Sequence, residues 1–389
     1  MDDVILCPFI QKYITELKQH PREYSYSGVC DSNPDDCSTS SPSPRLGDRF
    51  TLHAPYCKTY LRWEIIFNKH FPHLPPDLVL DCGSTGTAGS MWFDVTKCRT
   101  LQTWERQQGS FAALLEEVLQ QFRAYQEELV CSYPNERLHY EYNTVCGIKG
   151  VEFFMKSEEA EQRVRLMIPL TVDFSAVFSM LLGQSWAGEQ CHFFVEFGVR
   201  DGTRDSSSTM YIVHSEIHWP TLLVPFAWLV DYKYPVFALS GGNCLIQFIP
   251  ELESCINTVI SNKLGRYCRR KELCETLVAL FGHPLEYDAH QYTSISFLFN
   301  MELAFLVHVT MGENMTNYPA EAPLVQLSSV SAADVTSGKA VPIRCRLQKF
   351  DYEPSMSAVE VCTHIRNKLL EVQVEFADIC EAYMNKAVK

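Results

Sequence analysis

The sequence predicts an α+β protein made of tandem units, each an antiparallel meander sheet packed by helices. Two patterns lead to this prediction. Apolar residues alternate in short runs, as in the half-buried strand of Leu61, Trp63, Ile65 and Phe67. In longer stretches they recur at steps of three and four, as on one face of a helix. The order helix, strands, proline corner and long helix is typical of one helical layer over a meander sheet.

The first third of the chain supplies each element of this layout. A first helix is expected at about residues 4–18, and the Ser-, Pro- and Asp-rich residues 27–48 are expected to form a mobile surface loop. Strands follow near residues 61–67 and 77–80. Between them HFPHLPPD contains three prolines, which restrict the backbone and favour a rigid extended corner. An amphipathic helix is then expected over residues 111–129.

The middle third repeats the plan with four strands and a long helix. A helical region is expected from about residue 251 to residue 281, long enough to close one unit and to open the next. The expected strands are residues 151–155, 163–170, 190–199 and 210–219.

The last third shows the same order once more. Alternating runs predict strands at about residues 295–299 and 303–309, and NYPAEAPLVQL follows as a second tyrosine/proline corner. We therefore expect three domains, at residues 1–133, 134–262 and 263–389. The closing helix has an apolar stripe of Ala358, Cys362, Ile365, Leu369, Val372, Phe376, Ile379 and Tyr383.

Composition excludes several classes of protein. A chain of 389 residues with 46% hydrophobic content is long enough for two or three domains. The formal net charge of -14 disfavours binding to nucleic acid. No apolar run approaches the roughly 18 residues of a membrane span, and the acidic start MDDVILCPF is unlike a secretory signal. The sixteen cysteines contain no C-x-x-C pair, so we expect reduced thiols in a soluble, intracellular protein without membrane contact.

The proline corner carries a resemblance. An aromatic-proline pair followed by further prolines, after a strand and before a long helix, resembles the ubiquitin-conjugating fold and its inactive UEV and RWD relatives. Residues 71–76 match this corner well, and residues 318–323 match it more loosely. Nearly the whole chain is similar to the BRE family, the UEV-repeat subunits of the BRISC deubiquitinase and of its nuclear DNA-damage counterpart. The similar segments are LHAPYCKTYLRWEIIFNKHFPHLPPDLVL, RLMIPLTVDFS, GGNCLIQFIPEL, GRYCRRKELCETLVALFG, LEYDAHQYTSISFLF and LAFLVHV.

The resemblance implies a non-catalytic scaffold. Members of the BRE family join a lysine-63-specific JAMM-type zinc deubiquitinase and its Abraxas-like partner to a von Willebrand A-like subunit. Ubiquitin chains are a further candidate partner, and the two complexes imply a location in both cytoplasm and nucleus. The serine-rich N-terminal loop and residues 331–353 fit the resemblance poorly and carry no inference.

Cys98 is the candidate for a conjugating-enzyme nucleophile. It follows Pro76 at a comparable distance to the catalytic cysteine of active enzymes, and its neighbours Lys97 and Arg99 favour a thiolate. However, no His-Pro-Asn triplet occurs in the chain, and CGSTGTAGS offers no side-chain amide for an oxyanion. Cys82 is a weaker candidate. We therefore expect no catalytic residue, and keep two alternatives: a conjugating enzyme using Cys98, and a free ubiquitin receptor.

Metal and cofactor sites are also not expected. His214 and His218 lie four apart in HSEIH, but a zincin motif needs the glutamate directly after the first histidine, and the flanking residues favour a strand. A JAMM centre needs H-x-H, and no two of the twelve histidines lie two residues apart. The glycines at positions 83, 86 and 89 lack phosphate-loop spacing. The basic run at residues 263–271 is expected to be a solvated helix face, with an acidic docking partner as the alternative.

Five residues are candidates for contact with a partner. Tyr318 and Pro319 form the second corner. Val361, Val374 and Met384 lie beside the stripe of the closing helix and widen its apolar face, which is then wide enough to contact a partner subunit as well as its own sheet.

Overall fold

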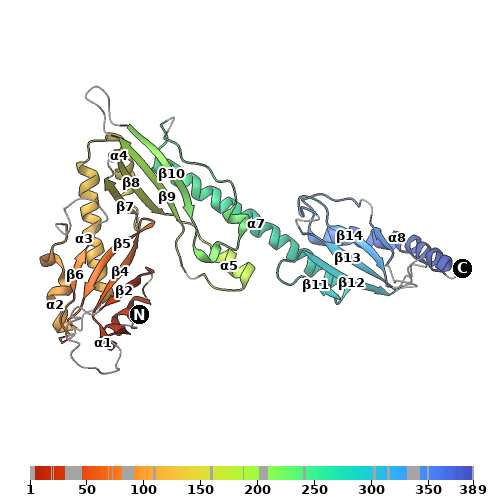
Figure 1. Cartoon of the computed structure of the whole chain (residues 1–389). Coiled ribbons are helices and arrows are strands. Elements are labelled where there is room, and N and C mark those ends of the chain that lie inside the picture. The colour runs from red at the N-terminus through yellow and green to blue at the C-terminus, as the bar shows by residue number, and fades with distance from the viewer. Residues whose placement is uncertain are drawn as a thin grey trace. The chain divides into compact units, whose positions relative to one another are not determined.

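The structure is a computed structural model that divides into two compact units (Figure 1). Unit 1 comprises residues 1–172 and 189–254, and unit 2 comprises residues 173–188 and 255–389. The residues described are 5–18, 20, 22–30, 46–68, 70–71, 73–80, 92–107, 111–157, 161–186, 188–200, 209–239, 242–300, 304–312, 316–330, 342–347 and 350–387.

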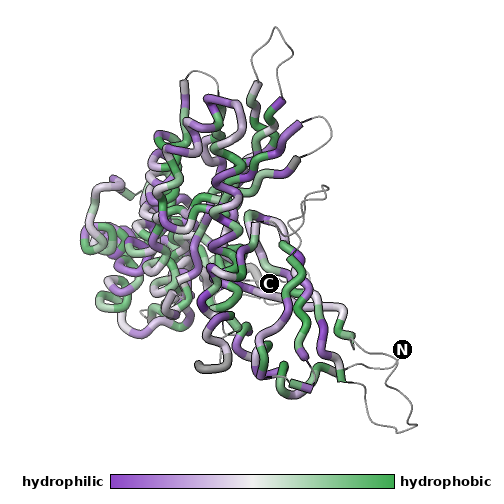
Figure 2. The backbone as a smooth tube through the Cα atoms, turned by 90° about the vertical axis from the view of Figure 1, so that its left-hand side faces the viewer, coloured by the Kyte–Doolittle hydropathy of each residue, from purple (hydrophilic) through white to green (hydrophobic). Residues whose placement is uncertain are grey.

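Unit 1 begins with an antiparallel sheet covered by two helices. Helix α1 (Pro8–Lys18) places Tyr13 against the ring of Phe67, with centroids 5.3 Å apart, and helix α3 (Phe111–Ser132) packs Phe111 on Phe67 at 5.9 Å. Along strand β4, half-buried and buried residues alternate. In the chain as a whole, hydrophilic and hydrophobic residues are interspersed (Figure 2). In sheet order the strands are β2 (Ser25–Cys30), β4 (Arg49–Tyr56), β5 (Thr59–Ile66) and β6 (Asp77–Leu80).

A second antiparallel sheet of unit 1 shares its core with the first. One face packs on helix α7, where the rings of Phe193 and Phe248 lie 5.1 Å apart. The other face contributes Phe154 and Phe194 to the core beneath α3, and Phe154 lies 6.4 Å from Phe122. In chain order the strands are β7 (Glu152–Ser157), β8 (Gln162–Pro169), β9 (His192–Arg200) and β10 (Thr209–His218), and each pairs with the next.

Helix α7 (Leu245–Phe281) begins in unit 1 and ends in unit 2. At its start, the N–H of Leu245 donates to the fully buried carboxylate of Glu141, which also pairs with Arg137. A carboxylate at a helix N-terminus is favoured because unpaired N–H groups point toward it. The remaining short elements are β1 (Ile5–Leu6), β3 (Leu46–Gly47), α2 (Arg99–Gln107), α4 (Glu136–Val145), α5 (Ser175–Leu182) and α6 (Ala227–Val230).

Unit 2 is a five-stranded antiparallel sheet packed by the second half of α7 and by α8 (Ala358–Ala387). Leu277 of α7 and Ile365 of α8 are fully buried in one core with Val307 of the sheet. The strands, in order across the sheet, are β11 (Glu286–Tyr287), β12 (Ser294–Asn300), β13 (Ala304–Thr310), β14 (Leu324–Ser329) and β15 (Arg344–Arg346).

The α+β class and the main elements are confirmed, with corrections at their ends. Residues 27–30 belong to strand β2 rather than to a loop, because Ser27 and Cys30 pair with β4 on either side of an irregularity in register. Residues 31–45 of the expected loop lie outside the described residues. Helix α7 starts at Leu245, ahead of the expected residue 251, because Glu141 caps it there. The division into three domains stays a prediction, and its boundary at residue 262 lies within α7.

Candidate functional site

The proline corner is a fixed turn beside the first sheet. The carbonyl and the side-chain oxygen of Asn68 both accept from the N–H of Phe71, each at 3.1 Å, and the N–H of Leu74 donates to the Phe71 carbonyl at 3.0 Å. Pro76 is buried and Pro75 is half-buried, whereas Phe71 is 54% exposed. Pro72 lies outside the described residues. These contacts give the corner a structural role and leave the Phe71 ring available at the surface.

Cys98 is not placed as a nucleophile. Its side chain is fully buried after the 3₁₀ turn of residues 95–97, and its thiol donates to Glu117 Oε2 at 3.0 Å. Burial, and then the hydrogen bond to Glu117, raise the pKa of Cys98 from 9.0 to about 12. Lys97 turns instead toward Asp94, at 3.5 Å. The expectation that Lys97 and Arg99 favour a thiolate is therefore wrong, because burial and a carboxylate acceptor outweigh sequence neighbours. Cys82 lies outside the described residues.

The two histidines of HSEIH lie on strand β10, as predicted. His214 Nε2 is 3.3 Å from a carboxylate oxygen of Glu216. The pKa of His218 is lowered, mainly by burial and further by Lys58. Within the part of the chain that the structure describes, no three His, Cys, Asp or Glu residues are grouped to hold a metal ion. The glycines at positions 83, 86 and 89 fall outside that part.

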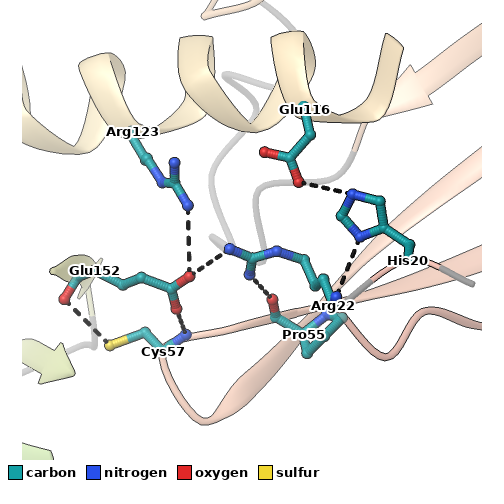
Figure 3. A network of polar contacts seen from close by, with 7 residues as sticks. All are labelled: His20, Arg22, Pro55, Cys57, Glu116, Arg123 and Glu152. Carbon is teal, nitrogen blue, oxygen red and sulfur yellow. Dashed lines mark hydrogen bonds and ion pairs between the residues drawn. The ribbon is translucent and has the colours of Figure 1, made fainter. Parts of the chain in front are cut away.

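Glu152 of β7 is the centre of a buried charge network that sequence reasoning missed (Figure 3). Its carboxylate lies 2.8 Å from Arg22, 3.7 Å from Arg123 of α3, and accepts from the backbone N–H of Cys57 at 2.7 Å. Arg22 also donates to the carbonyl of Pro55. A carboxylate taken out of water needs such partners, and here they come from the first sheet, from α3 and from the segment before β2.

The tip of the β4–β5 hairpin is held by the second sheet as well. Cys57 and Lys58 both have positive φ, at 47° and 58°, a conformation that costs energy for residues other than glycine. Lys58 pairs with Glu216, and its ammonium lies 5.3 Å from the centre of the Phe194 ring. With the Glu152 network, these contacts join the two sheets of unit 1 into one body. No local pattern in the sequence could reveal them, because the partners are far apart along the chain.

On helix α8, one candidate contact residue, Val361, is buried, contrary to expectation, and another, Val374, is exposed. Val361 is fully buried, so it belongs to the core and does not widen an open face. Val374 is 62% exposed, and the neighbouring Leu370 is 46% exposed. Phe376 is buried and packs on Phe305, with ring centroids 5.9 Å apart. The side chain of Met384 lies outside those described. The exposed large apolar residues among the described side chains of α8 are therefore Val359, Leu370, Val374 and Ile379.

The second corner is largely internal. Tyr318 is 1% exposed and faces Tyr352, with ring centroids 6.2 Å apart, and the Tyr318–Pro319 peptide bond is cis. The hydroxyl of Tyr352 donates to the carbonyl of Pro319, which is half-buried. The ring of Tyr318 is therefore part of the core of unit 2 and is not accessible at the surface. Contact of this corner with a partner stays a prediction.

The basic run of residues 263–271 is partly structural. Arg270 is buried and donates to the carbonyl of Gln291 at 3.0 Å. Arg269 donates to the carbonyl of Met356 and lies 3.5 Å from Glu272. Lys271 lies 4.0 Å from Glu275. Through these hydrogen bonds, Arg270 connects α7 to the loop before β12 and Arg269 connects it to the loop before α8. The run is therefore partly buried and structural, and not only a solvent-exposed helix face.

No helix among the described residues is both long enough and apolar enough to cross a membrane. Residues 5–332 match the family described as brain and reproductive organ-expressed protein (BRE). The chain is similar to BRISC and BRCA1-A complex member 2 of Branchiostoma floridae, at 24% identity over 90% of this chain and 91% of that protein. It is also similar to the protein of that name in Danio rerio, at 26% identity over 76% of this chain and 74% of that one. The chain belongs to the BRE family.

Proposed function

We propose that this protein is a non-catalytic scaffold subunit of a lysine-63-specific JAMM-type deubiquitinase complex, present in cytoplasm and nucleus. In this role it joins the peptidase and its Abraxas-like partner to a von Willebrand A-like subunit. Each of the three large sheets, with its helices, is then a UEV-like unit that binds and does not conjugate.

Membership of the BRE family carries the proposal, since both relatives are named as members of the BRISC and BRCA1-A complexes. Two features of the structure support it. The Cys98 thiol is buried, and its pKa of about 12 leaves it protonated at neutral pH. The Glu152 network and the hairpin tip join two sheets into one body, which suits a subunit that holds partners at a set distance.

Affinity purification of the tagged chain from its own cells, followed by identification of the bound subunits, tests the proposal. We expect a JAMM-type peptidase, an Abraxas-like protein and a von Willebrand A-like protein to be recovered together. Native mass measurement of the same sample separates the scaffold from a free ubiquitin receptor. A single species near 44.5 kDa would favour the receptor.

A thioester assay tests the enzyme alternative. The chain is mixed with activating enzyme, ATP and ubiquitin, and we expect no reductant-sensitive adduct, because a protonated, buried thiol cannot attack a thioester. An adduct that forms on the wild-type chain and is lost in Cys98→Ser would overturn the scaffold-only role.

A further inference from the structure

Unit 2 contains an apolar groove of about 310 Å³ where the end of α7, strands β12 and β13, and helix α8 meet. This volume is at the low end of the range of about 300 to 1,000 Å³ typical of ligand sites. It suits a side chain or two of a peptide better than a folded domain. We call it the unit-2 groove; its lining residues are Leu280, Phe281, Phe299, Phe305, Arg366, Leu369, Leu370 and Gln373.

The floor of the unit-2 groove is aromatic and firmly packed. The rings of Phe299 and Phe305 stack with centroids 5.7 Å apart, and Phe281 meets Phe299 edge-on at 5.0 Å. At the rim, Leu280 and Leu370 remain exposed. An apolar side chain entering the groove would bury its own surface and cover both leucines, at about 25 cal/mol per Å² of apolar area removed from water.

Arg366 supplies a positive group at this apolar rim. It is exposed on α8, and its guanidinium has no hydrogen bond or ion pair with any other residue that the structure describes. The neighbouring cation Lys368, by contrast, is paired: its ammonium lies 2.8 Å from the carboxylate of Glu371. Arg366, Leu370 and Gln373 follow at steps of four and three, so they lie along one face of the helix. The exposed guanidinium of Arg366 therefore attracts an acidic group to this rim.

We infer that the unit-2 groove binds a short linear segment of a partner protein in which a bulky apolar residue lies close to an Asp or Glu. The apolar side chain enters the floor formed by Phe299 and Phe305. The carboxylate meets the planar guanidinium of Arg366, which accommodates it through two parallel hydrogen bonds. The amide of Gln373 is placed to bond the backbone of the segment. This inference does not depend on which complex the protein joins.

A peptide selection tests the recognition chemistry. A random peptide library displayed on phage is selected against the immobilised full chain, against Arg366→Glu, and against Arg346→Glu as a matched charge reversal on exposed β15 of the same unit. From the wild type and from Arg346→Glu we expect peptides with a bulky apolar residue beside an acidic one. From Arg366→Glu we expect a basic residue in place of the acidic one. No enrichment over bare resin, or an acidic preference that survives Arg366→Glu, would overturn the inference.

Fluorescence anisotropy with the selected acidic peptide then locates the site. We expect Arg366→Glu and Leu370→Asp each to weaken binding at least about tenfold, and Arg346→Glu to change it less than about twofold. Both groove residues are exposed, so thermal melts of the variants should match the wild type. Equal binding by all variants would place the peptide elsewhere and reject the groove. The affinity purification that tests the proposed complex is a separate measurement.

Discussion

At the scale of single residues, burial decides chemistry more than sequence neighbours do. Cys98 has Lys97 and Arg99 beside it in the chain, yet its thiol is buried and donates to Glu117. The basic residues closest to Glu152 in sequence are Lys149 and Lys156, yet its carboxylate pairs with the distant Arg22 and Arg123. In both cases, folding brings a distant group to the side chain and determines its protonation or its pairing.

Loss of the Glu152 carboxylate should destabilise unit 1 strongly. Glu152→Ala leaves two partly buried guanidinium groups and the N–H of Cys57 without their acceptor, a change that costs about 3 to 5 kcal/mol for buried pairs. Urea unfolding measures the loss. The matched control is Glu64→Ala, because Glu64 pairs with Arg49 at the surface, where such pairs contribute about 0 to 1 kcal/mol. Equal losses in the two variants would show that the network contributes no more than a surface pair.

Cys98 should make stability depend on alkaline pH. Because folding raises its pKa from 9.0 to about 12, its contribution is complete below pH 9 and is lost as the pH rises toward 12. The stability advantage of the wild type over Cys98→Ala should therefore shrink in unfolding measurements above pH 9. Iodoacetamide labelling at neutral pH provides a second check, since Cys98 should stay unmodified while the exposed Cys268 reacts. An advantage constant across this pH range would contradict the assignment.

At the scale of elements, α8 has an inner face that packs on its own sheet and an outer face that is exposed. Phe376 and Val361 are buried in the core of unit 2, and Val374 and Leu370 point away from it. The stripe of four and three residue steps correctly predicted that Ile365, Leu369 and Phe376 are buried, but its member Ile379 is 37% exposed. It could not show that Val361 joins the buried side, because the width of a buried face depends on how the sheet curves beneath it.

The inner face should control stability. Phe376→Ala removes a ring that packs on Phe305 and leaves a cavity, at a cost of about 3 to 5 kcal/mol. Chemical unfolding of the full chain measures this loss. The exposed neighbour Glu375→Ala serves as a control and should change the free energy of unfolding by no more than about 0.5 kcal/mol.

The outer face should control partner capture. Val374→Asp places a charge on an exposed position, so the melting temperature should stay close to that of the wild type. We expect the same variant to lose the von Willebrand A-like subunit in a pull-down. A Val374→Asp chain that melts normally and still captures this subunit would exclude α8 from the interface, and the docking surface would then belong to unit 1.

At the scale of the whole molecule, the contacts group the chain into two compact units, and we expect each of them to unfold as a unit. The first two sheets share an apolar core, the Glu152 network and the hairpin tip, whereas the third sheet has its own core. Groups that share a core lose their contacts together when one of them unfolds.

Calorimetry of the full chain should therefore show two thermal transitions. Glu152→Ala should lower the temperature of one of them and Phe376→Ala should lower the other, because each change affects one unit alone. Three transitions, with Glu152→Ala affecting two of them, would favour the division at residues 1–133, 134–262 and 263–389.

The sequence by itself determined the α+β class, most strands, the two long helices and the absence of a conjugating-enzyme motif. These features depend on local periodicity and on short motifs, which a single chain displays directly. Only the tertiary structure decided the state of Cys98, the burial of Val361 and Tyr318, the Glu152 network and the unit-2 groove. The physical reason is sequence distance. Glu152 meets Cys57 across 95 positions and Arg22 across 130, and no local pattern records which distant side chain will accept a hydrogen bond or cover an apolar face.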